Sequence, residues 1–163
     1  GYWQAVTKIS DYYLTFITSV LVVYYMPRLS EIQLKQELKA EILKGYKLIL
    51  PVVGLLALLI WFFKDFIIYI LFTPAFSAMK PLFTFQLLGD FFKIGSWLLA
   101  YLMVAKAMTK IYIYTEVGFA ASNVALSYLL INHFGIIGAT YSFCINYFLY
   151  WILMWFVMKK HIQ

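Results

Sequence analysis

The sequence has 163 residues, enough for one soluble domain, but 64% are apolar, 21% aromatic and only 12% charged. A soluble domain draws about a quarter of its residues from the charged types, so this chain has too few polar side chains to cover a surface in water. The composition and the mean hydropathy of +0.84 therefore exclude a soluble enzyme and indicate a membrane protein.

Other residue types exclude further classes of site. The single cysteine, Cys144, lies in an apolar run and offers neither a disulfide framework nor a cysteine-rich metal site. Two histidines, His133 and His161, are too few for a zinc site of the usual kind. The chain starts at Gly1 rather than Met and shows no signal peptide, so we expect it to be a piece of a longer chain.

Five apolar runs are long enough to cross a bilayer as helices, which takes roughly 20 residues each. We predict spans at about residues 3–26, 48–63, 82–104, 111–131 and 136–158. Pro27 is expected to end the first span, since its ring cannot continue a helix interior, and Pro74 and Pro81 are expected to enclose a loop. The runs do not alternate between apolar and polar residues as barrel strands do, so an all-α fold is favoured.

The segment over about residues 30–47, between the first two spans, is the only densely charged one. An apolar stripe at four-residue spacing runs through it, formed by Leu34, Leu38 and Ile42. Glu31 and Lys35 stand four residues apart, which favours an ion pair on a helix. The pattern predicts an amphipathic cytoplasmic helix along the membrane surface, with a solvated linker as the alternative.

Positive residues near span ends indicate which side of the membrane each end faces. Nine of the 13 Lys and Arg residues follow the first, third and fifth spans: Arg28, Lys35, Lys39, Lys44, Lys47, Lys106, Lys110, Lys159 and Lys160. The opposite side receives mainly Lys64 and Lys80. We therefore predict a cytoplasmic C-terminus, and attribute the net charge of +6 to loops near anionic lipid rather than to nucleic-acid binding.

Polar residues inside the third span recur at helical spacing. Gln86, Asp90, Lys93 and Trp97 share one predicted helix face, with Lys93 near the middle of the bilayer and Asp90 one turn away. Buried charges are costly in lipid, so this face is expected to line a bundle interior or a wet cavity. The alternative is that Asp90 and Lys93 form an ion pair that only holds helices together, and that Trp97 serves helix or lipid packing.

Two other spans carry polar faces as well. The first has Gln4, Lys8, Asp11, Thr15 and Thr18, and the fourth has Glu116, Asn123 and Ser127. Glu116 lies close enough to the cytoplasmic end to pair with Lys106 or Lys110 instead of a ligand.

Aromatic residues near span ends are interpreted as headgroup anchors: Tyr12, Tyr13, Tyr24, Tyr25, Trp61 and Trp155. Small residues are expected at close helix contacts: Gly89, Gly95, Gly118, Ala121 and Ala125.

Short motifs along the chain resemble a known family. They are Gly1-Tyr2-Trp3-Gln4, Ile9-Ser10-Asp11, Phe16-Ile17-Thr18, Pro27-Arg28-Leu29-Ser30, Phe76-Ser77-Ala78-Met79, Gln86-Leu87-Leu88-Gly89-Asp90, Lys93, Ala105-Lys106-Ala107, Tyr112-Ile113 and Glu116-Val117. In this order they resemble the C-terminal part of bacterial Wzx-type lipid-linked oligosaccharide flippases, which include the O-antigen and common-antigen translocases. The resemblance is most specific between Phe76 and Glu116 and weakens after Leu126.

The resemblance implies the C-terminal lobe of a twelve-helix transporter similar to the multidrug and toxin extrusion proteins, with these spans as the last five. It implies alternating-access transport of an undecaprenyl-pyrophosphate-linked oligosaccharide across the bacterial inner membrane, not catalysis. Lys93 would attract the pyrophosphate or an acidic sugar, Asp90 would hold Lys93, and Trp97 and Gln86 would line the cavity. No cofactor is expected. We expect transport to be coupled to H⁺ or Na⁺, with Asp11 or Glu116 as the residue that binds the ion. Expected partners are the bilayer and a polysaccharide polymerase with its chain-length regulator.

Three other functions remain open at this point. A drug or cation antiporter of the same fold would use an unpaired cavity carboxylate, which Asp11 or Glu116 could supply. A membrane-embedded glycosyltransferase or polymerase would need a large catalytic loop, whereas the longest extracytoplasmic connection, residues 64–81, is mostly apolar. A purely structural membrane subunit would not require three spans with polar faces.

Overall fold

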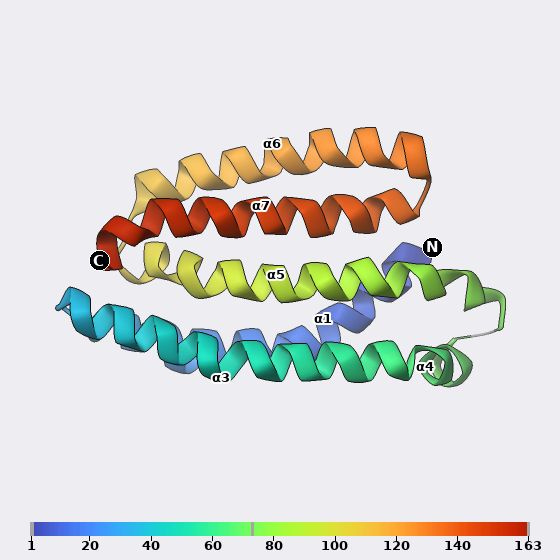
Figure 1. Cartoon of the computed structure of the whole chain (residues 1–163), viewed down its shortest axis with the longest axis horizontal. Coiled ribbons are helices and arrows are strands. Elements are labelled where there is room, and N and C mark those ends of the chain that lie inside the picture. Colours follow the sequence, from blue (N-terminus) through green and yellow to red (C-terminus); the bar gives the residue numbers. More distant parts are fainter. Residues whose placement is uncertain (1, 73, 163) are drawn as a thin grey trace.

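The computed structural model of the chain describes residues 2–72 and 74–162, and every element in these ranges is helical (Figure 1). The elements are α1 (Tyr2–Val20), the π-helical η1 (Leu21–Tyr25), α2 (Met26–Glu31), α3 (Lys35–Phe62), α4 (Lys64–Leu71), the 3₁₀-helical η2 (Pro74–Met79), α5 (Lys80–Ala105), α6 (Thr109–Phe134) and α7 (Ile137–Ile162). Five helical stretches are long and apolar enough to cross a bilayer. The prediction of an all-α membrane fold is confirmed.

The first span continues past the position where we expected it to stop. α1, η1 and α2 follow one another without a break from Tyr2 to Glu31. Pro27 lies in the first turn of α2, after the wider π-helical turns of η1. Inside this continuous helix the proline removes one backbone hydrogen bond, and π-helical turns such as those of η1 are among the irregularities that accompany such a site. The prediction that Pro27 ends the helix is therefore wrong.

The separate amphipathic helix expected over residues 30–47 is also wrong. Residues 35–47 form the first part of α3, which runs on as one helix to Phe62. The apolar stripe packs into the bundle, because Leu38 and Ile42 are buried. Glu31 pairs with Arg28 at 3.7 Å rather than with Lys35. Nothing between residues 35 and 50 breaks a helix, so the charged segment extends the second span instead of lying apart from it.

A compact connection joins α3 to α5. The apolar α4 and the short η2 fill the region where we expected a loop between two prolines. The Lys80 ammonium contacts Asp65 Oδ1 at 3.0 Å and so ties the start of α5 to α4. Pro81 lies in the first turn of α5, where the absence of a backbone N–H is harmless.

α5 is the central helix of the bundle. It packs against α1, α3 and α7, whereas α6 lies on the outside against α7 (Figure 1). Close approach between α5 and α7 depends on Gly89 and Gly95, where an added Cβ would overlap Phe143 and Trp151. This confirms two of the small residues expected at helix contacts. Gly118 meets nothing within 4 Å, and Ala121 and Ala125 are exposed, so no helix among the described residues packs against these three.

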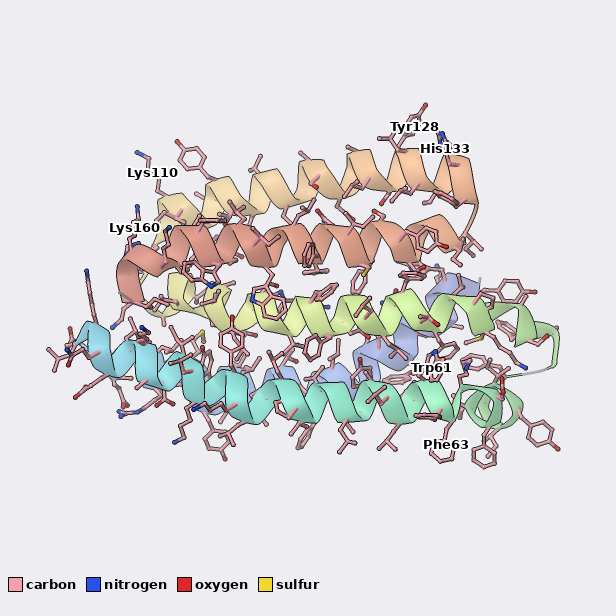
Figure 2. The ribbon with its side chains drawn as sticks, in the orientation of Figure 1. Trp61, Phe63, Lys110, Tyr128, His133 and Lys160 are labelled. Carbon is pink, nitrogen blue, oxygen red and sulfur yellow. The ribbon has the colours of Figure 1, made fainter. Side chains whose placement is uncertain are left out.

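The positive segments predicted to share one side of the membrane meet at one end of the bundle. The Lys106 ammonium bonds to the Ile32 carbonyl, and the Lys35 ammonium donates to the Lys160 carbonyl at 3.3 Å. Figure 2 shows Lys110 and Lys160 at this end and His133 at the opposite end. Successive spans therefore run antiparallel. The links at residues 32–34 and 106–108 and the end of α7 lie together at this end of the bundle.

Candidate functional site

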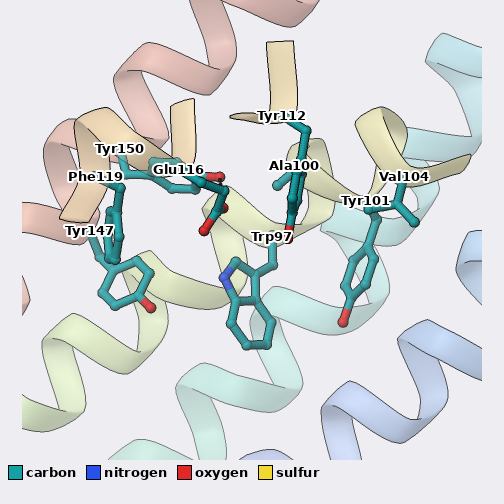
Figure 3. Close-up of a pocket in the computed structure, with 9 residues that line it drawn as sticks. All are labelled: Trp97, Ala100, Tyr101, Val104, Tyr112, Glu116, Phe119, Tyr147 and Tyr150. Carbon is teal, nitrogen blue, oxygen red and sulfur yellow. Dashed lines mark hydrogen bonds between the residues drawn. The ribbon is translucent and has the colours of Figure 1, made fainter. Parts of the chain in front are cut away.

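A cleft of about 270 Å³ lies where α5, α6 and α7 meet (Figure 3). Its lining residues are Trp97, Ala100, Tyr101 and Val104 from α5, Tyr112, Glu116 and Phe119 from α6, and Tyr147 and Tyr150 from α7. Six of these nine side chains are aromatic. We call this the aromatic cleft.

Lys93 lies at the edge of the aromatic cleft. It stands one turn before Trp97 on α5, so the two side chains share a face. The Lys93 ammonium lies 4.7 Å from the centre of the Trp97 ring and 5.8 Å from that of Tyr147, and both rings line the cleft. Such cation–π contacts contribute about 0.5–2 kcal/mol each. The two rings thus hold the ammonium in place without neutralising its charge.

No ion pair neutralises Lys93 among residues 2–72 and 74–162. The side chain is half-buried in the middle of an apolar helix, where insertion scales assign a lysine about 2.5–3.5 kcal/mol of unfavourable free energy. Two cation–π contacts of about 0.5–2 kcal/mol each offset a comparable amount, but they leave the positive charge without a counter-ion. The unpaired charge indicates a site where an anion or water completes the environment of the ammonium.

Glu116 supplies the carboxylate of the aromatic cleft. Its carboxylate is directed toward the Trp97 indole (Figure 3), and the Tyr150 hydroxyl donates to Oε1 at a long 3.4 Å. The alternative pairing with Lys106 or Lys110 does not occur, since Lys106 bonds to backbone carbonyl groups instead. The cleft therefore has a carboxylate on α6 and an ammonium at its α5 edge.

Asp90 does not pair with Lys93 as expected. Its side chain is fully buried at the contact between α1 and α5, and the Tyr13 hydroxyl donates to Oδ2 at 2.8 Å. The two residues do not share a face as predicted, because α5 has neighbours on several sides. Asp90 consequently faces α1, whereas Lys93 faces the rings of α5 and α7.

The other two predicted site residues lie outside the aromatic cleft. Gln86 is buried on α5, and its Oε1 has no hydrogen-bond partner. Asp11 is exposed on α1, on the same polar face as Lys8. The structure therefore brings together Lys93, Trp97 and Glu116 but not Asp11 or Gln86.

Several tyrosines of the site were missed or misread in the sequence. Tyr147 and Tyr150 lie three residues apart on α7, a spacing that places two rings on one helix face. That signal was present, but aromatic residues in apolar helices are too common to single them out. Tyr13 and Tyr25, interpreted as headgroup anchors, instead bond inside the bundle to Asp90 and to the Leu98 carbonyl.

The aromatic cleft has the chemistry of a saccharide site. The C–H face of a sugar ring is apolar and packs against the π-face of an aromatic ring, while its hydroxyls bond to charged or phenolic groups at the rim. Trp97 and the tyrosines supply the rings, and Glu116 and Lys93 supply the charges. No group of three or more metal-binding side chains occurs in the described part of the chain.

Two curated proteins are similar to almost the whole chain. The Lipid III flippase of Escherichia coli (strain K12) and that of Shigella flexneri are each 37% identical to it over 153 residues, which is 94% of this chain. The match covers 37% of the length of each relative, so the chain spans little more than a third of them. No family model matches the chain, and no solved structure matches it significantly. The similarity confirms the resemblance to the Wzx-type lipid-linked oligosaccharide flippases that the sequence motifs indicated.

Proposed function

We propose that the chain forms part of a flippase that moves a polyprenyl-pyrophosphate-linked oligosaccharide from one leaflet of a membrane to the other. The observation that carries the proposal is the Lys93 ammonium, unpaired among the described residues and held beside an aromatic cleft in an apolar bundle. The names of the two relatives support the same class of cargo and favour transport over a drug antiporter or an enzyme.

The chemical demand on such a protein is to pass a large anionic head group while its hydrocarbon tail stays in lipid. A lysine ammonium is a compact charge that binds phosphate oxygens, and aromatic rings receive sugar faces. We assign Lys93 to the pyrophosphate or to an acidic sugar, and the cleft rings with Glu116 to the adjoining saccharide. Trp97 has both roles, because it orients Lys93 and lines the cleft.

The polar face of α1 supports a second lobe. Lys8 and Asp11 are exposed on a helix that is otherwise apolar enough to span a bilayer, and charged groups avoid acyl chains. We propose that the rest of a twelve-helix, MATE-like protein faces this surface, and that the two lobes alternate access to the cavity between them.

The remaining assignments follow the same proposal. The protein would reside in the bacterial inner membrane with its C-terminus in the cytoplasm, where it would work with a polysaccharide polymerase and a chain-length regulator. No cofactor is proposed. Transport would draw on an H⁺ or Na⁺ gradient.

The test is Lys93→Ala in the full-length protein, reconstituted with a fluorescent polyprenyl-pyrophosphate saccharide. A charge-assisted hydrogen bond contributes about 1.5–3 kcal/mol, so translocation should fall by roughly 10–100-fold. Lys64→Ala is the matched control, since the Lys64 ammonium also lies over an indole ring, 4.2 Å from Trp61, but outside the cleft. Equal translocation by the two variants would remove Lys93 from the mechanism.

A further inference from the structure

The carboxylate of Asp90 is enclosed between α1 and α5. The side chain has 0% of its surface exposed, and one hydrogen bond from Tyr13 reaches Oδ2. Oδ1 has no hydrogen-bond partner. The hydroxyl of Ser10, buried on α1, is a second polar neighbour of this carboxylate, but it is not in normal hydrogen-bond geometry with Oδ1. Two unsatisfied polar atoms therefore lie together in a region without solvent.

The charged and titratable groups around Asp90 do not supply a counter-ion. Asp11 and Tyr13 face it from α1, Lys93 from α5 and Tyr147 from α7. Lys93 forms no ion pair with it within 4 Å, because its ammonium lies over the Trp97 and Tyr147 rings. Asp11 is a second carboxylate and repels negative charge. An ionised Asp90 would thus be a buried anion with hydroxyl neighbours but no counter-ion, an arrangement that proteins avoid.

One proton satisfies all of these groups at once. A neutral carboxyl with the proton on Oδ1 donates a hydrogen bond to Ser10 Oγ, while Oδ2 still accepts from the Tyr13 hydroxyl. Loss of that proton leaves the Ser10 and Tyr13 hydroxyls donating to a buried charge that has no counter-ion, and hydration of the carboxylate then requires α1 to move away from α5.

The shape of the first span gives such a movement a place to occur. On the C-terminal side of the Asp90 contact, α1 continues into the π-helical turns of η1. Such segments are frequent at functional sites and at bends in helices. At the end of η1, the Tyr25 hydroxyl is anchored to the Leu98 carbonyl of α5 at 2.5 Å. A movement of the N-terminal part of α1 would therefore pivot near η1, where Tyr25 attaches the helix to α5.

We propose that Asp90, with Ser10 and Tyr13, is a proton-binding site that closes α1 onto α5 when it is protonated and loosens this contact when the proton leaves. The site is distinct from the aromatic cleft and does not depend on what the protein carries. If the proposed flippase activity is correct, Asp90 rather than Asp11 or Glu116 takes up the coupling proton.

A buried cysteine probe tests the movement in the full-length protein. Leu14 lies one turn beyond Ser10 and is 3% exposed, so in a Cys144→Ser background a Leu14→Cys thiol reports opening of the contact. Its labelling rate is divided by that of Phe16→Cys, at a position 68% exposed, which cancels the pH dependence of the thiol itself. At pH values above the midpoint of the Asp90 titration, the ratio of the two labelling rates should rise by up to about tenfold per pH unit.

Asp90→Asn should make this ratio low and independent of pH, since the amide imitates the protonated carboxyl by donating to Ser10 and accepting from Tyr13. Asp65→Asn, which removes an exposed carboxylate in α4, should keep the native pH profile. The same pH profile in Asp90→Asn as in the native protein would overturn the proposal. If the labelling ratio changes with Na⁺ concentration at constant pH, the site binds a metal cation rather than a proton, and the proposal is also overturned.

Infrared spectroscopy provides a second readout if the cysteine variants do not fold. The native protein should show the carbonyl stretch of a protonated carboxylic acid that titrates with pH and is absent from Asp90→Asn. If Asp90→Asn retains that band, the proton lies elsewhere. Neither measurement involves transport, so a failure of the proposed flippase activity leaves this inference standing, and the reverse holds as well.

Discussion

Tyr46 joins three helices through one hydroxyl group. From α3, it donates to the Gly95 carbonyl of α5 at 2.9 Å and accepts from the Trp151 indole N–H of α7 at 3.1 Å. Its ring also stacks on Trp151, with centroids 6.1 Å apart. Because Gly95 has no side chain, the indole lies directly over α5. This cluster fixes the order of three helices beside the candidate site.

Tyr46→Phe should therefore destabilise the bundle without changing its packing volume. The substitution leaves the Trp151 N–H unpaired and removes the second hydrogen bond to the Gly95 carbonyl, which keeps its bond within α5. Hydrogen bonds between membrane helices contribute about 0.6–2 kcal/mol each. We expect a loss of roughly 1–3 kcal/mol in the free energy of unfolding, measured by denaturant titration in detergent micelles. Tyr69→Phe, at a position 77% exposed on α4, should change nothing measurable.

For single residues, the sequence predicted which polar side chains lie inside apolar helices but not where those side chains point. Helical spacing correctly placed Asp90 and Lys93 inside the bundle. Spacing did not predict which neighbouring helix each side chain contacts, because a central helix is covered on several sides. Successive residues of a helix point about 100° apart, so residues close in sequence can face different neighbours. Tyr13 could not be assigned to Asp90, since the two lie 77 residues apart and only the fold brings them together.

Among the elements, the α6–α7 hairpin shows how backbone contact sets helix spacing. Gly135, with φ of 73°, makes the turn, and Gly138 then lies directly against the α6 backbone. A Cβ built on Gly138 would approach the Leu130 carbonyl oxygen to 2.2 Å, which no side-chain rotation relieves. The outer helix α6 is held close to α7 at this end by the absence of one methyl group.

Gly138→Ala should open this end of the hairpin. Overpacking typically costs about 1–3 kcal/mol, so the unfolding free energy should fall by that amount in the same micelle titration. Gly118→Ala on α6 is the matched control, because its Cβ would meet nothing within 4 Å. There the better helix propensity of alanine should raise stability by about 0.5–1 kcal/mol. Equal destabilisation by both substitutions would contradict the close contact at Gly138.

Hydropathy was sufficient to predict the number and approximate positions of the spans, because long apolar runs have few alternatives in a membrane. The boundaries needed tertiary information. Pro27 continues a helix because η1 precedes it, and the charged residues 35–47 extend α3 because Leu38 and Ile42 find a core to pack into. Local patterns do not distinguish an amphipathic stripe that meets lipid headgroups from one that meets other helices.

Across the whole molecule, charge is concentrated at one end. Lys35, Lys106, Lys110 and Lys160 lie around the links at residues 32–34 and 106–108 and the end of α7, and two of these lysines bond to backbone carbonyls of neighbouring segments. The same ammonium groups that bias orientation in the membrane thus also hold helix ends together. The opposite end, around residues 63–80 and 135, is mostly apolar or aromatic.

This asymmetry predicts the orientation of the bundle. Because positive loops remain in the cytoplasm, the end with Lys110 should face inward and the end with His133 outward (Figure 2). In a Cys144→Ser background, His133→Cys should react with a membrane-impermeant thiol reagent on intact cells, whereas Lys110→Cys should react only after permeabilisation. Both positions are exposed, so burial does not confound the comparison. The reverse pattern would place the C-terminus outside, together with the end of the aromatic cleft formed by Val104 and Tyr112.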